Sequence, residues 1–375
     1  MTKKRILIIF GTRPEAIKLA PLIYELKKNT SQFETTICVT GQHREMLDQV
    51  LHFFNIEPDI DLKLMTHNQS LAELNAKILL EIDNLLKNNS FDYVIIQGDT
   101  TTVYSSAVAA FYNKVKIIHI EAGLRSYNFE HPFPEEFNRR SISSFTDFNF
   151  VPSKQAEQNL LKENISKNKI WNVGNTVIDA LKFTLNVVSK EENTFYQTFK
   201  EINFDKKIIL VTGHRRENFG TPLQNICEAF IEITDNHEDV QIVYPVHLNP
   251  NVQGIVQSML KDKKNIVLIP PLPYQQMIWL MNKSSFIITD SGGIQEEAPA
   301  LGKPVLVTRE TTERKEVVES GNAIMVGYDK EKIIHYSKSL IENKEFYNKM
   351  SSSSNPYGNG TTAKQIVEIL TQYDK

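Results

Sequence analysis

The sequence is poor in cysteine and in long apolar runs. Its 375 residues include only Cys38 and Cys227. Two cysteines make neither a disulfide framework nor a zinc site, so both are interpreted as small core side chains of a reduced, cytosolic protein. The apolar run after the charged N-terminus ends at Gly11, which is too short for a signal-peptide core or a membrane span. We therefore expect a cytoplasmic protein with no membrane partner.

The sequence also lacks an excess of basic charge and several cofactor motifs. Lysine and arginine number 42 against 45 acidic residues, a net charge of −3, which argues against nucleic acid as the main partner. No GxGxxG follows the first predicted strand and no GxxxxGK[ST] occurs, which excludes the usual nicotinamide and P-loop signatures. No histidine pair has zinc-ligand spacing, and the DxD stretch Asp59–Asp61 is interpreted as a solvated loop. We expect no metal or cofactor.

Short apolar runs alternating with amphipathic helical patterns are the main feature that is present. The chain is too long for one ordinary core, so two domains are expected. The alternation is typical of parallel, doubly wound sheets. It loosens over about 153–205 and then restarts, and we place the domain boundary near 173–176. Strands are predicted at 6–10, 36–40, 93–97, 115–120, 207–211, 240–246, 266–269, 286–289 and 305–308.

Ligands of open α/β sheets bind at the carboxyl ends of the strands, so the residues that follow each strand are the site candidates. The first strand is followed by Gly11–Glu15, where a helix start can attract an anion and Arg13 can contact a phosphate. The alternative is a tight turn with a solvated arginine.

Three carboxylates of the first domain lie in comparable places. Asp99 ends an apolar strand, where it could instead be a helix N-cap. Glu121 ends another strand, and an ion pair with Arg125 or Arg139 is the structural alternative. Glu135 stands in a proline-bounded loop, where a carboxylate is usually just solvated. Together the three could converge, and clustered carboxylates suit acid–base chemistry because their pKa values move apart.

The second half of the chain contributes a histidine and a glycine-rich turn. His214 follows a predicted strand and could carry a proton or contact a phosphate, unless it only begins a capped helix. The stretch Asp290–Glu297 follows another strand and opens a helix, an arrangement that offers backbone N–H groups to a sugar nucleotide. Its candidate contacts are Ser291, Gly292, Gly293 and Glu297, the last of them for the ribose hydroxyls.

These and other motifs resemble the non-hydrolysing UDP-N-acetylglucosamine 2-epimerases of bacteria. The resemblance runs from residue 5 to about 370. The motifs that carry it are FGTRPEAIK (10–18), TGQHREMLDQVL (40–51), GDTTT (98–102), HIEAGLR (119–125), PFPEEFNR (132–139), GNTVIDAL (174–181), TGHRREN (212–218), YPVHLNP (244–250), DSGGIQEEAP (290–299), LGKPVLV (301–307), TTER (311–314) and NPYGNG (355–360).

The resemblance implies a glycosyltransferase-B-like α/β fold, with two Rossmann-like domains whose parallel sheets face a cleft. The N-terminal domain would span 1–173 and be completed by a C-terminal helix, 361–375, and the UDP-binding domain would span 174–355. It also implies a homodimer that needs neither metal nor nicotinamide. The reaction would eliminate UDP to give 2-acetamidoglucal and add it back after the proton returns to carbon 2 on the other face. The product would supply N-acetylmannosamine for cell-surface polysaccharide.

The resemblance assigns roles to matching positions. The acid–base carboxylates would be Asp99, Glu121 and Glu135, and the groups steadying the diphosphate would be Arg13 and His214. The UDP cradle would be Ser291, Gly292, Gly293 and Glu297, with Lys18 and Arg314 as further site residues and Met277 where relatives carry an aromatic near the uracil. Some members are activated by UDP-N-acetylglucosamine at a second site, which would match Gln42, Gln69, Arg215 and His247.

Three other functions compete with this one. A hydrolysing 2-epimerase would release N-acetylmannosamine and UDP. A retaining UDP-sugar glycosyltransferase would have a similar fold and a similar glycine-rich turn. A nucleotide-sugar sensor would bind without turnover. Fold alone does not choose between them.

Overall fold

The computed structural model describes residues 3–41, 44–66 and 69–373. The chain divides into two compact units, the first formed by Met1–Ala180 with Tyr357–Lys375 and the second by Leu181–Pro356. Each is built around a parallel sheet, as the strand–helix alternation predicts.

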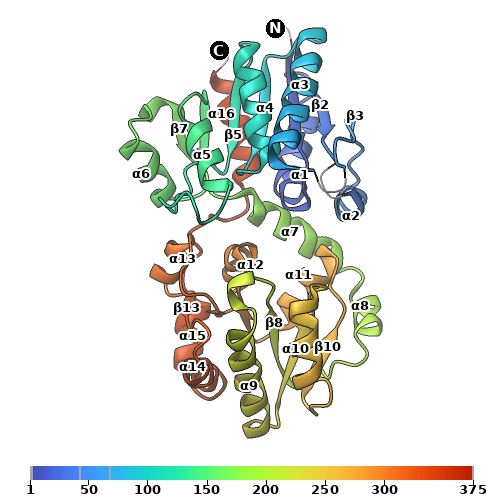
Figure 1. Cartoon of the computed structure of the whole chain (residues 1–375), viewed down its shortest axis with the longest axis vertical. Coiled ribbons are helices and arrows are strands. Elements are labelled where there is room, and N and C mark those ends of the chain that lie inside the picture. Colours follow the sequence, from blue (N-terminus) through green and yellow to red (C-terminus); the bar gives the residue numbers. More distant parts are fainter. Residues whose placement is uncertain (1–2, 42–43, 67–68, 374–375) are drawn as a thin grey trace. The chain divides into compact units, whose positions relative to one another are not determined.

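Strands and helices alternate throughout the first unit (Figure 1). Its elements are β1 (Lys4–Phe10), α1 (Arg13–Lys28), β2 (Phe33–Val39), α2 (Arg44–Phe53), β3 (Ile60–Asp61), α3 (Leu71–Asn88), β4 (Tyr93–Gln97), α4 (Thr101–Tyr112), β5 (Lys116–Ile120), α5 (Glu135–Ser143), β6 (Phe148–Val151), α6 (Lys154–Lys162), η1 (Lys167–Lys169), β7 (Ile170–Asn172), α7 (Thr176–Val188), which continues into the second unit, and α16 (Thr362–Tyr373).

The sheet of the first unit has the order β3-β2-β1-β4-β5-β6-β7. Ile8 of β1 is paired with Ile37 on one side and Ile95 on the other, so the strand order reverses between β1 and β4. Strand β4 is buried along its whole length, as expected for a parallel strand covered by helices on both faces. Open α/β sheets bind ligands at the carboxyl ends of the strands where the order reverses. The segments after β1 and β4 are therefore candidate ligand contacts.

The last helix, α16, belongs to the first unit and packs against α1 (Figure 1). Its first turn is fixed by Asp179 of α7, whose carboxylate accepts the backbone N–H groups of Thr362 at 3.3 Å and Ala363 at 2.9 Å. A carboxylate at a helix N-terminus also opposes the positive end of the helix dipole. At the other end of α16, the ring of Tyr373 contacts that of Phe148 edge-on.

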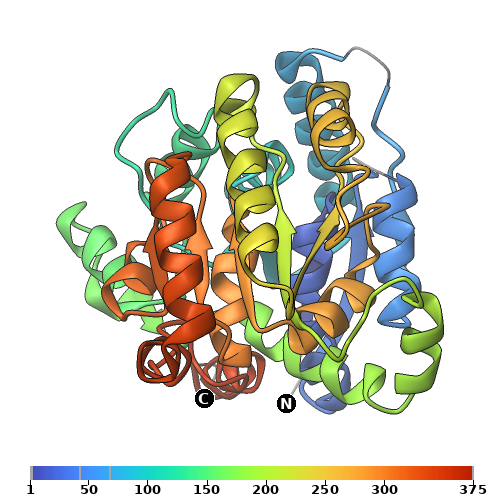
Figure 2. The same cartoon turned by 90° about the horizontal axis from the view of Figure 1, so that it is seen from below.

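The second unit repeats this architecture with the strand order β10-β9-β8-β11-β12-β13. Helix α9 packs beside α14 (Figures 1 and 2). Here the order reverses between β8 and β11. The remaining elements are α8 (Glu192–Thr198), β8 (Lys207–Thr212), η2 (Arg216–Asn218), α9 (Thr221–Asn236), β9 (Val240–Pro245), α10 (Pro250–Leu260), β10 (Ile266–Ile269), α11 (Tyr274–Lys283), β11 (Phe286–Thr289), α12 (Gly292–Glu297), η3 (Ala298–Leu301), β12 (Val305–Val307), α13 (Lys315–Glu319), β13 (Ala323–Met325), α14 (Lys330–Glu342) and α15 (Lys344–Ser351).

One stretch interpreted as a solvated loop proves to be an edge strand. Ile60 and Asp61 form β3 and pair with Cys38 and Val39 of β2. Just before them, the carboxylate of Asp59 accepts the backbone N–H of Ile37 at 2.7 Å. The DxD stretch is therefore tied to the sheet by its acidic side chain, which the loop interpretation missed.

Candidate active site

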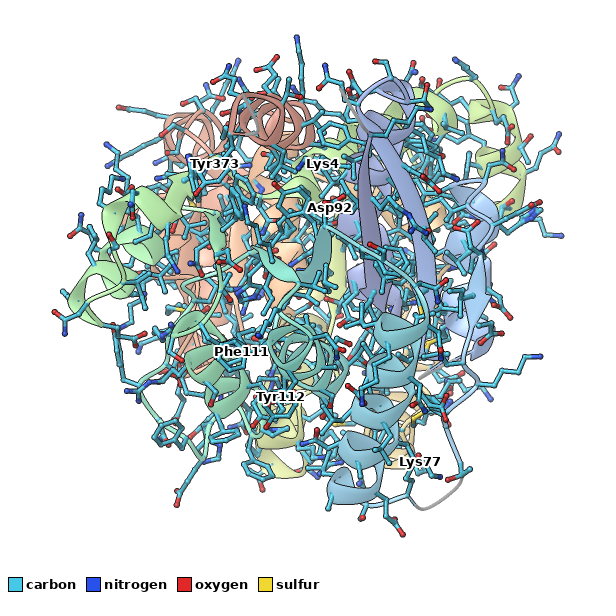
Figure 3. The ribbon with its side chains drawn as sticks, turned by 90° about the horizontal axis from the view of Figure 1, so that it is seen from above. Lys4, Lys77, Asp92, Phe111, Tyr112 and Tyr373 are labelled. Carbon is cyan, nitrogen blue, oxygen red and sulfur yellow. The ribbon has the colours of Figure 1, made fainter. Side chains whose placement is uncertain are left out.

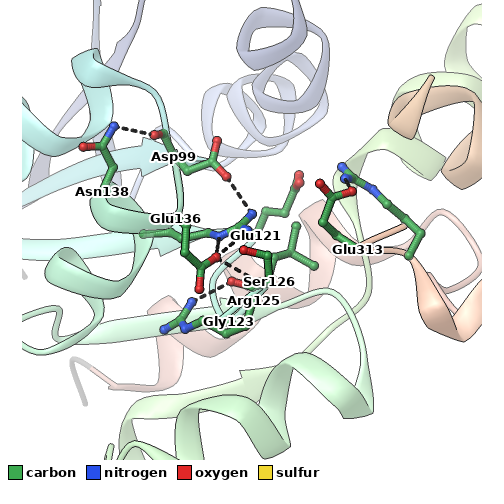
Figure 4. Close-up of polar contacts among 12 residues, drawn as sticks. Asp99, Glu121, Gly123, Arg125, Ser126, Glu136, Asn138 and Glu313 are labelled. Carbon is green, nitrogen blue, oxygen red and sulfur yellow. Dashed lines mark hydrogen bonds and ion pairs between the residues drawn. The ribbon is translucent and has the colours of Figure 1, made fainter. Parts of the chain in front are cut away.

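Asp99 lies immediately after β4 and does not cap the helix that follows. The N-cap of α4 is Thr100, whose side chain accepts the N–H of Val103. The Asp99 carboxylate instead lies 3.2 Å from Nη1 of Arg139, and its backbone carbonyl accepts a hydrogen bond from Asn138 at 2.8 Å (Figure 4). Its side chain remains 26% exposed, so a ligand can reach it.

Glu121 directly follows β5 and has a left-handed backbone conformation, with φ of +66°. This conformation is uncommon for a residue other than glycine and is found disproportionately at functional sites. Its nearly buried carboxylate pairs with Lys18 at 2.5 Å and accepts a hydrogen bond from Gln97 at 2.8 Å. The expected alternative, a pair with Arg125 or Arg139, is therefore wrong: the partner is a lysine from α1.

Glu135 is the first residue of α5, so the interpretation of this stretch as a loop is wrong. The next residue, Glu136, has a fully buried side chain that accepts the backbone N–H groups of Ser126 and Tyr127, both at 2.9 Å. Helix α5 also supplies Asn138 and Arg139, the two residues that contact Asp99.

The first helix start is already occupied by a carboxylate of the protein itself. Glu15 accepts the backbone N–H groups of Gly11 at 2.8 Å and Thr12 at 2.7 Å, and the hydroxyl of Thr100 at 2.6 Å. Burial raises the pKa of Glu15, although these hydrogen bonds oppose the rise. The amides of Gly11 and Thr12 are thus satisfied within the protein, and anion binding at this turn would depend on Arg13, the first residue of α1.

A buried histidine supports the same edge of the sheet. The ring Nε2 of His119 lies 2.7 Å from the carbonyl oxygen of Gly98 and donates to it, because a carbonyl can only accept. Burial lowers the pKa of His119 to about 4, so the ring stays neutral at physiological pH. Sequence reasoning missed this role, since the residue lies inside an apolar strand and only the strand pairing brings it to Gly98.

The ends of β4 and β5 lie side by side, because Gln97 is paired with Ile120. This register brings Asp99 and Glu121 to adjacent strand ends, and α5 brings Glu135 to the same region through its contacts with Asp99. Asp99 and Glu121 therefore lie at adjacent strand ends of one sheet, and Glu135 begins the helix whose Asn138 and Arg139 contact Asp99.

In the second unit, His214 follows β8 and is oriented by a buried carboxylate. One oxygen of Asp290 accepts the backbone N–H groups of His214 at 2.9 Å and Arg215 at 2.8 Å, and the amide of Asn218 at 3.2 Å. The other oxygen lies 3.3 Å from Nδ1 of the His214 ring. Burial raises the pKa of Asp290, but the His214 ring and these amides outweigh it and hold the pKa below its usual value.

The glycine-rich turn after β11 leads into helix α12 and packs against the guanidinium of Arg314. A Cβ atom at Gly292 would come within 2.9 Å of Cζ of Arg314, so glycine is what lets that guanidinium lie there. Arg314 pairs with Glu296 at 2.9 Å and with Glu313 at 3.3 Å. Burial raises the pKa of Glu313, but Arg314 and Arg309 outweigh it and bring the pKa to about 2.

The other residues predicted to bind UDP lie in or next to the short helix α12. Ser291 is its N-cap residue, and Gly293 is its second residue. Glu297 is its last residue and accepts the hydroxyl of the buried Tyr274 at 2.9 Å. Tyr274 begins α11, which also carries the partly buried Met277. Neither Tyr274 nor Glu296 stood out in the sequence, because their partners lie 18 to 23 residues away.

The candidate activator residues are distributed over both units. Gln42 lies outside the described residues, and Gln69 precedes α3, where its side chain accepts the N–H of Thr66 at 3.2 Å. In the second unit the ring of His247 stacks on that of His214, with centroids 5.5 Å apart. Arg215 adjoins His214 on the loop that Asp290 holds.

The described part of the chain holds no group of three or more His, Cys, Asp or Glu side chains placed to bind a metal ion. Nor does any of its helices have the length and apolar character needed to cross a membrane.

Comparison with known proteins decides the family. The sequence profile of the UDP-N-acetylglucosamine 2-epimerase family matches residues 25–371. The chain is 51% identical to the UDP-N-acetylglucosamine 2-epimerase of Campylobacter jejuni, over 98% of this chain and 97% of that one. The chain belongs to this epimerase family. The family resemblance inferred from the motifs is thus confirmed.

Solved structures agree with this assignment. The epimerase from Neisseria meningitidis, bound to UDP-GlcNAc, superimposes on this one with a TM-score of 0.92 at 46% identity, covering 98% of this chain and all of the other. The glycotransferase of kitacinnamycin shares the fold at 11% identity, with a TM-score of 0.63 over 99% of this chain and 100% of the other. The expected glycosyltransferase-B-like fold is confirmed.

Proposed function

We propose that this epimerase interconverts UDP-N-acetylglucosamine and UDP-N-acetylmannosamine by inverting carbon 2 without releasing the sugar. The observation that carries the proposal is that Asp99 and Glu121 follow adjacent strands, while Glu135 begins the helix that contacts Asp99. Inversion needs one group to take a proton from one face of the sugar and another to return a proton to the opposite face. Positioned carboxylates are suited to both tasks.

The chemistry proceeds by elimination, because the hydrogen on carbon 2 is not adjacent to a carbonyl. A base takes that proton, the bond from carbon 1 to the UDP oxygen breaks, and 2-acetamidoglucal and UDP remain bound. A proton then returns to carbon 2 on the other face, and UDP re-forms its bond to carbon 1. The sequence of steps is redox-neutral, so it calls for no nicotinamide, and the leaving diphosphate can be stabilised by cationic side chains.

We assign the proton transfers to the first unit and the binding of UDP to the second. In the first unit Lys18 pairs with Glu121, and Arg13, the first residue of α1, would contact the diphosphate. In the second unit His214, oriented by Asp290, would contact the diphosphate. UDP would be bound by Ser291, Gly292, Gly293, Glu297 and Arg314, with Met277 near the uracil.

Proton NMR of UDP-N-acetylglucosamine with the protein in deuterated water tests the proposed reaction. Epimerisation predicts a second anomeric signal, from UDP-N-acetylmannosamine, with deuterium entering carbon 2. Free N-acetylmannosamine would instead mean hydrolysis. Binding with an unchanged spectrum would favour a glycosyltransferase lacking its acceptor, or a sensor.

The proposal includes a homodimer formed by the first unit. Helices α3, α4 and α5 of this unit expose large apolar side chains, which are Leu80 (61%), Phe111 (55%), Tyr112 (67%) and Phe137 (48%). Figure 3 shows Phe111 and Tyr112 next to each other at the end of α4. Exposed apolar side chains on neighbouring helices are typical of an association surface.

The proposal also includes activation by a second UDP-N-acetylglucosamine and a role in supplying cell-surface polysaccharide. Support for activation comes from the stacking of His247 on His214, which would join an activator contact to a substrate contact. Activation then means a coupling between two binding events.

We place the reaction in the cytoplasm, and the two free, buried cysteines, Cys38 and Cys227, fit a reducing compartment.

A further inference from the structure

Glu136 is a fully buried carboxylate, and both of its oxygens accept hydrogen bonds from the protein (Figure 4). Its Oε1 accepts the backbone N–H of Tyr127 at 2.9 Å. Its Oε2 accepts two hydrogen bonds, from the backbone N–H of Ser126 at 2.9 Å and from the Nε–H of Arg139 at 2.7 Å. Nη2 of Arg139 lies 2.5 Å from the same oxygen. A charge buried this deeply is tolerated only when it is paired and hydrogen-bonded throughout.

This environment keeps Glu136 ionised. Burial raises its pKa, but the N–H of Ser126 and the guanidinium of Arg139 outweigh that effect, so the pKa lies below its usual value. A carboxylate that is fully buried and permanently charged at neutral pH cannot exchange protons with a substrate. Its effect on chemistry must pass through the groups that it holds.

The group that it holds is Arg139, whose side chain is 5% exposed. Nε and Nη2 of the guanidinium face Glu136, and Nη1 reaches Oδ2 of Asp99 at 3.2 Å. Because the guanidinium is a rigid planar fork, fixing one edge on Glu136 also fixes the direction of the edge that meets Asp99. The neighbouring Asn138 holds the backbone carbonyl of Asp99, so α5 fixes this residue at two points.

The same helix turn links two of the proposed acid–base groups. Glu135 begins α5, and Glu136, Asn138 and Arg139 follow within four residues. The elements that fix Asp99 are therefore continuous with the backbone that presents Glu135. A displacement of this turn would move both carboxylates together.

We infer that Glu136 and Arg139 are positioning residues for the epimerisation, with Glu136 fixing the guanidinium of Arg139 and Arg139 fixing the carboxylate of Asp99. The inference rests on the proposed function, in which Asp99 transfers a proton. Neither residue is required to touch the substrate. The pair matters because a misplacement of about 1 Å at a reacting group can lower a rate about 100-fold.

Arg139→Lys is the decisive variant, because it keeps the buried positive charge but cannot bridge Glu136 and Asp99 with a rigid fork. We expect kcat to fall about 10- to 100-fold, with KM and the affinity for UDP within about twofold of wild type. Glu136→Gln, which lacks the charge that orients Arg139, should lower kcat similarly and reduce Tm as well.

The matched control is Glu163→Gln. Glu163 makes a bidentate pair with Arg125, whose side chain is fully buried, but neither residue contacts Asp99. This variant should lose stability without losing kcat. If Glu163→Gln and Arg139→Lys lower kcat equally, the loss reflects damaged packing and the inference is wrong.

A double-mutant cycle with Asp99→Asn separates positioning from a structural role. If Arg139 acts through Asp99, then Arg139→Lys has little further effect on kcat once Asp99→Asn is present. An equal loss in both backgrounds would overturn the inference. Wild-type turnover is measured first: an inactive wild type contradicts the proposed function itself and the inference with it, whereas an active wild type with an unimpaired Arg139→Lys contradicts the inference alone.

Discussion

At the scale of single residues, what surrounds a carboxylate decides what it does. Glu15 and Glu136 are buried and saturated by hydrogen bonds from the protein, so they shape the backbone around them. Asp290 orients a histidine ring and the loop that carries it. Asp99 and Glu121 are also held, but they follow strand ends, where open α/β sheets bind ligands, and the Asp99 side chain is partly exposed. Acidic side chains at similar places in the sequence thus divide into supporting groups and the groups to which we assign proton transfer.

Glu313 gives a pH-dependent prediction. Its pKa falls from the ordinary 4.5 to about 2 in the folded protein, so its stabilising effect is complete above the ordinary value and is lost as the pH falls through the interval between them. Glu313→Gln should therefore cost roughly 3 kcal/mol near neutral pH and almost nothing near pH ~2. Urea unfolding of both proteins across this range measures the difference.

Glu319→Gln is the control for that measurement, because Glu319 is an exposed carboxylate of the same unit. It should leave the free energy of unfolding nearly unchanged at every pH. A Glu313→Gln deficit that stays constant down to pH ~2 would mean that packing, not charge, accounts for the loss.

At the scale of elements, the glycine-rich turn after β11 requires a residue without a side chain at position 292. Gly292→Ala would press a Cβ atom against the guanidinium of Arg314 at 2.9 Å. Either Arg314 or the turn must move, and we expect the affinity for UDP, measured by calorimetry, to fall about 10-fold. Gly254→Ala is the control, because Gly254 lies within α10 with open space around its Cα. That variant should leave UDP affinity unchanged and stabilise the protein slightly. Unchanged affinity in Gly292→Ala would contradict the assigned cradle.

The central strands could be predicted from the sequence because they are continuous apolar runs. Those at 93–97, 266–269 and 286–289 match the structure to the residue. The predictions missed β3, β6, β7 and β13, which are only two to four residues long and leave little periodicity to detect. The start of α5 was missed because the prolines just before it indicate a loop.

The candidate site was predictable to the extent that parallel strands end at a common edge. That rule alone brings Asp99 and Glu121 near each other, since each follows an apolar run that predicts a strand. Their partners could not be predicted in the same way. Lys18 and Glu121 are 103 residues apart, and Arg139 and Asp99 are 40 apart, so only the packing of α1 and α5 on the sheet brings them together.

At the scale of the whole molecule, the exposed aromatic face predicts the oligomeric state. Phe111 and Tyr112 are more than half exposed at the end of α4, and a dimer that buries them would remove apolar surface from water. Wild type should sediment at twice the monomer mass. The double variant Phe111→Lys, Tyr112→Lys should sediment as a monomer, because a lysine buried without a partner is costly. Leu248→Lys, at a 68% exposed site in the second unit, should remain dimeric. A double variant that still dimerises would place the interface on another face, and a monomeric wild type would contradict the dimer altogether.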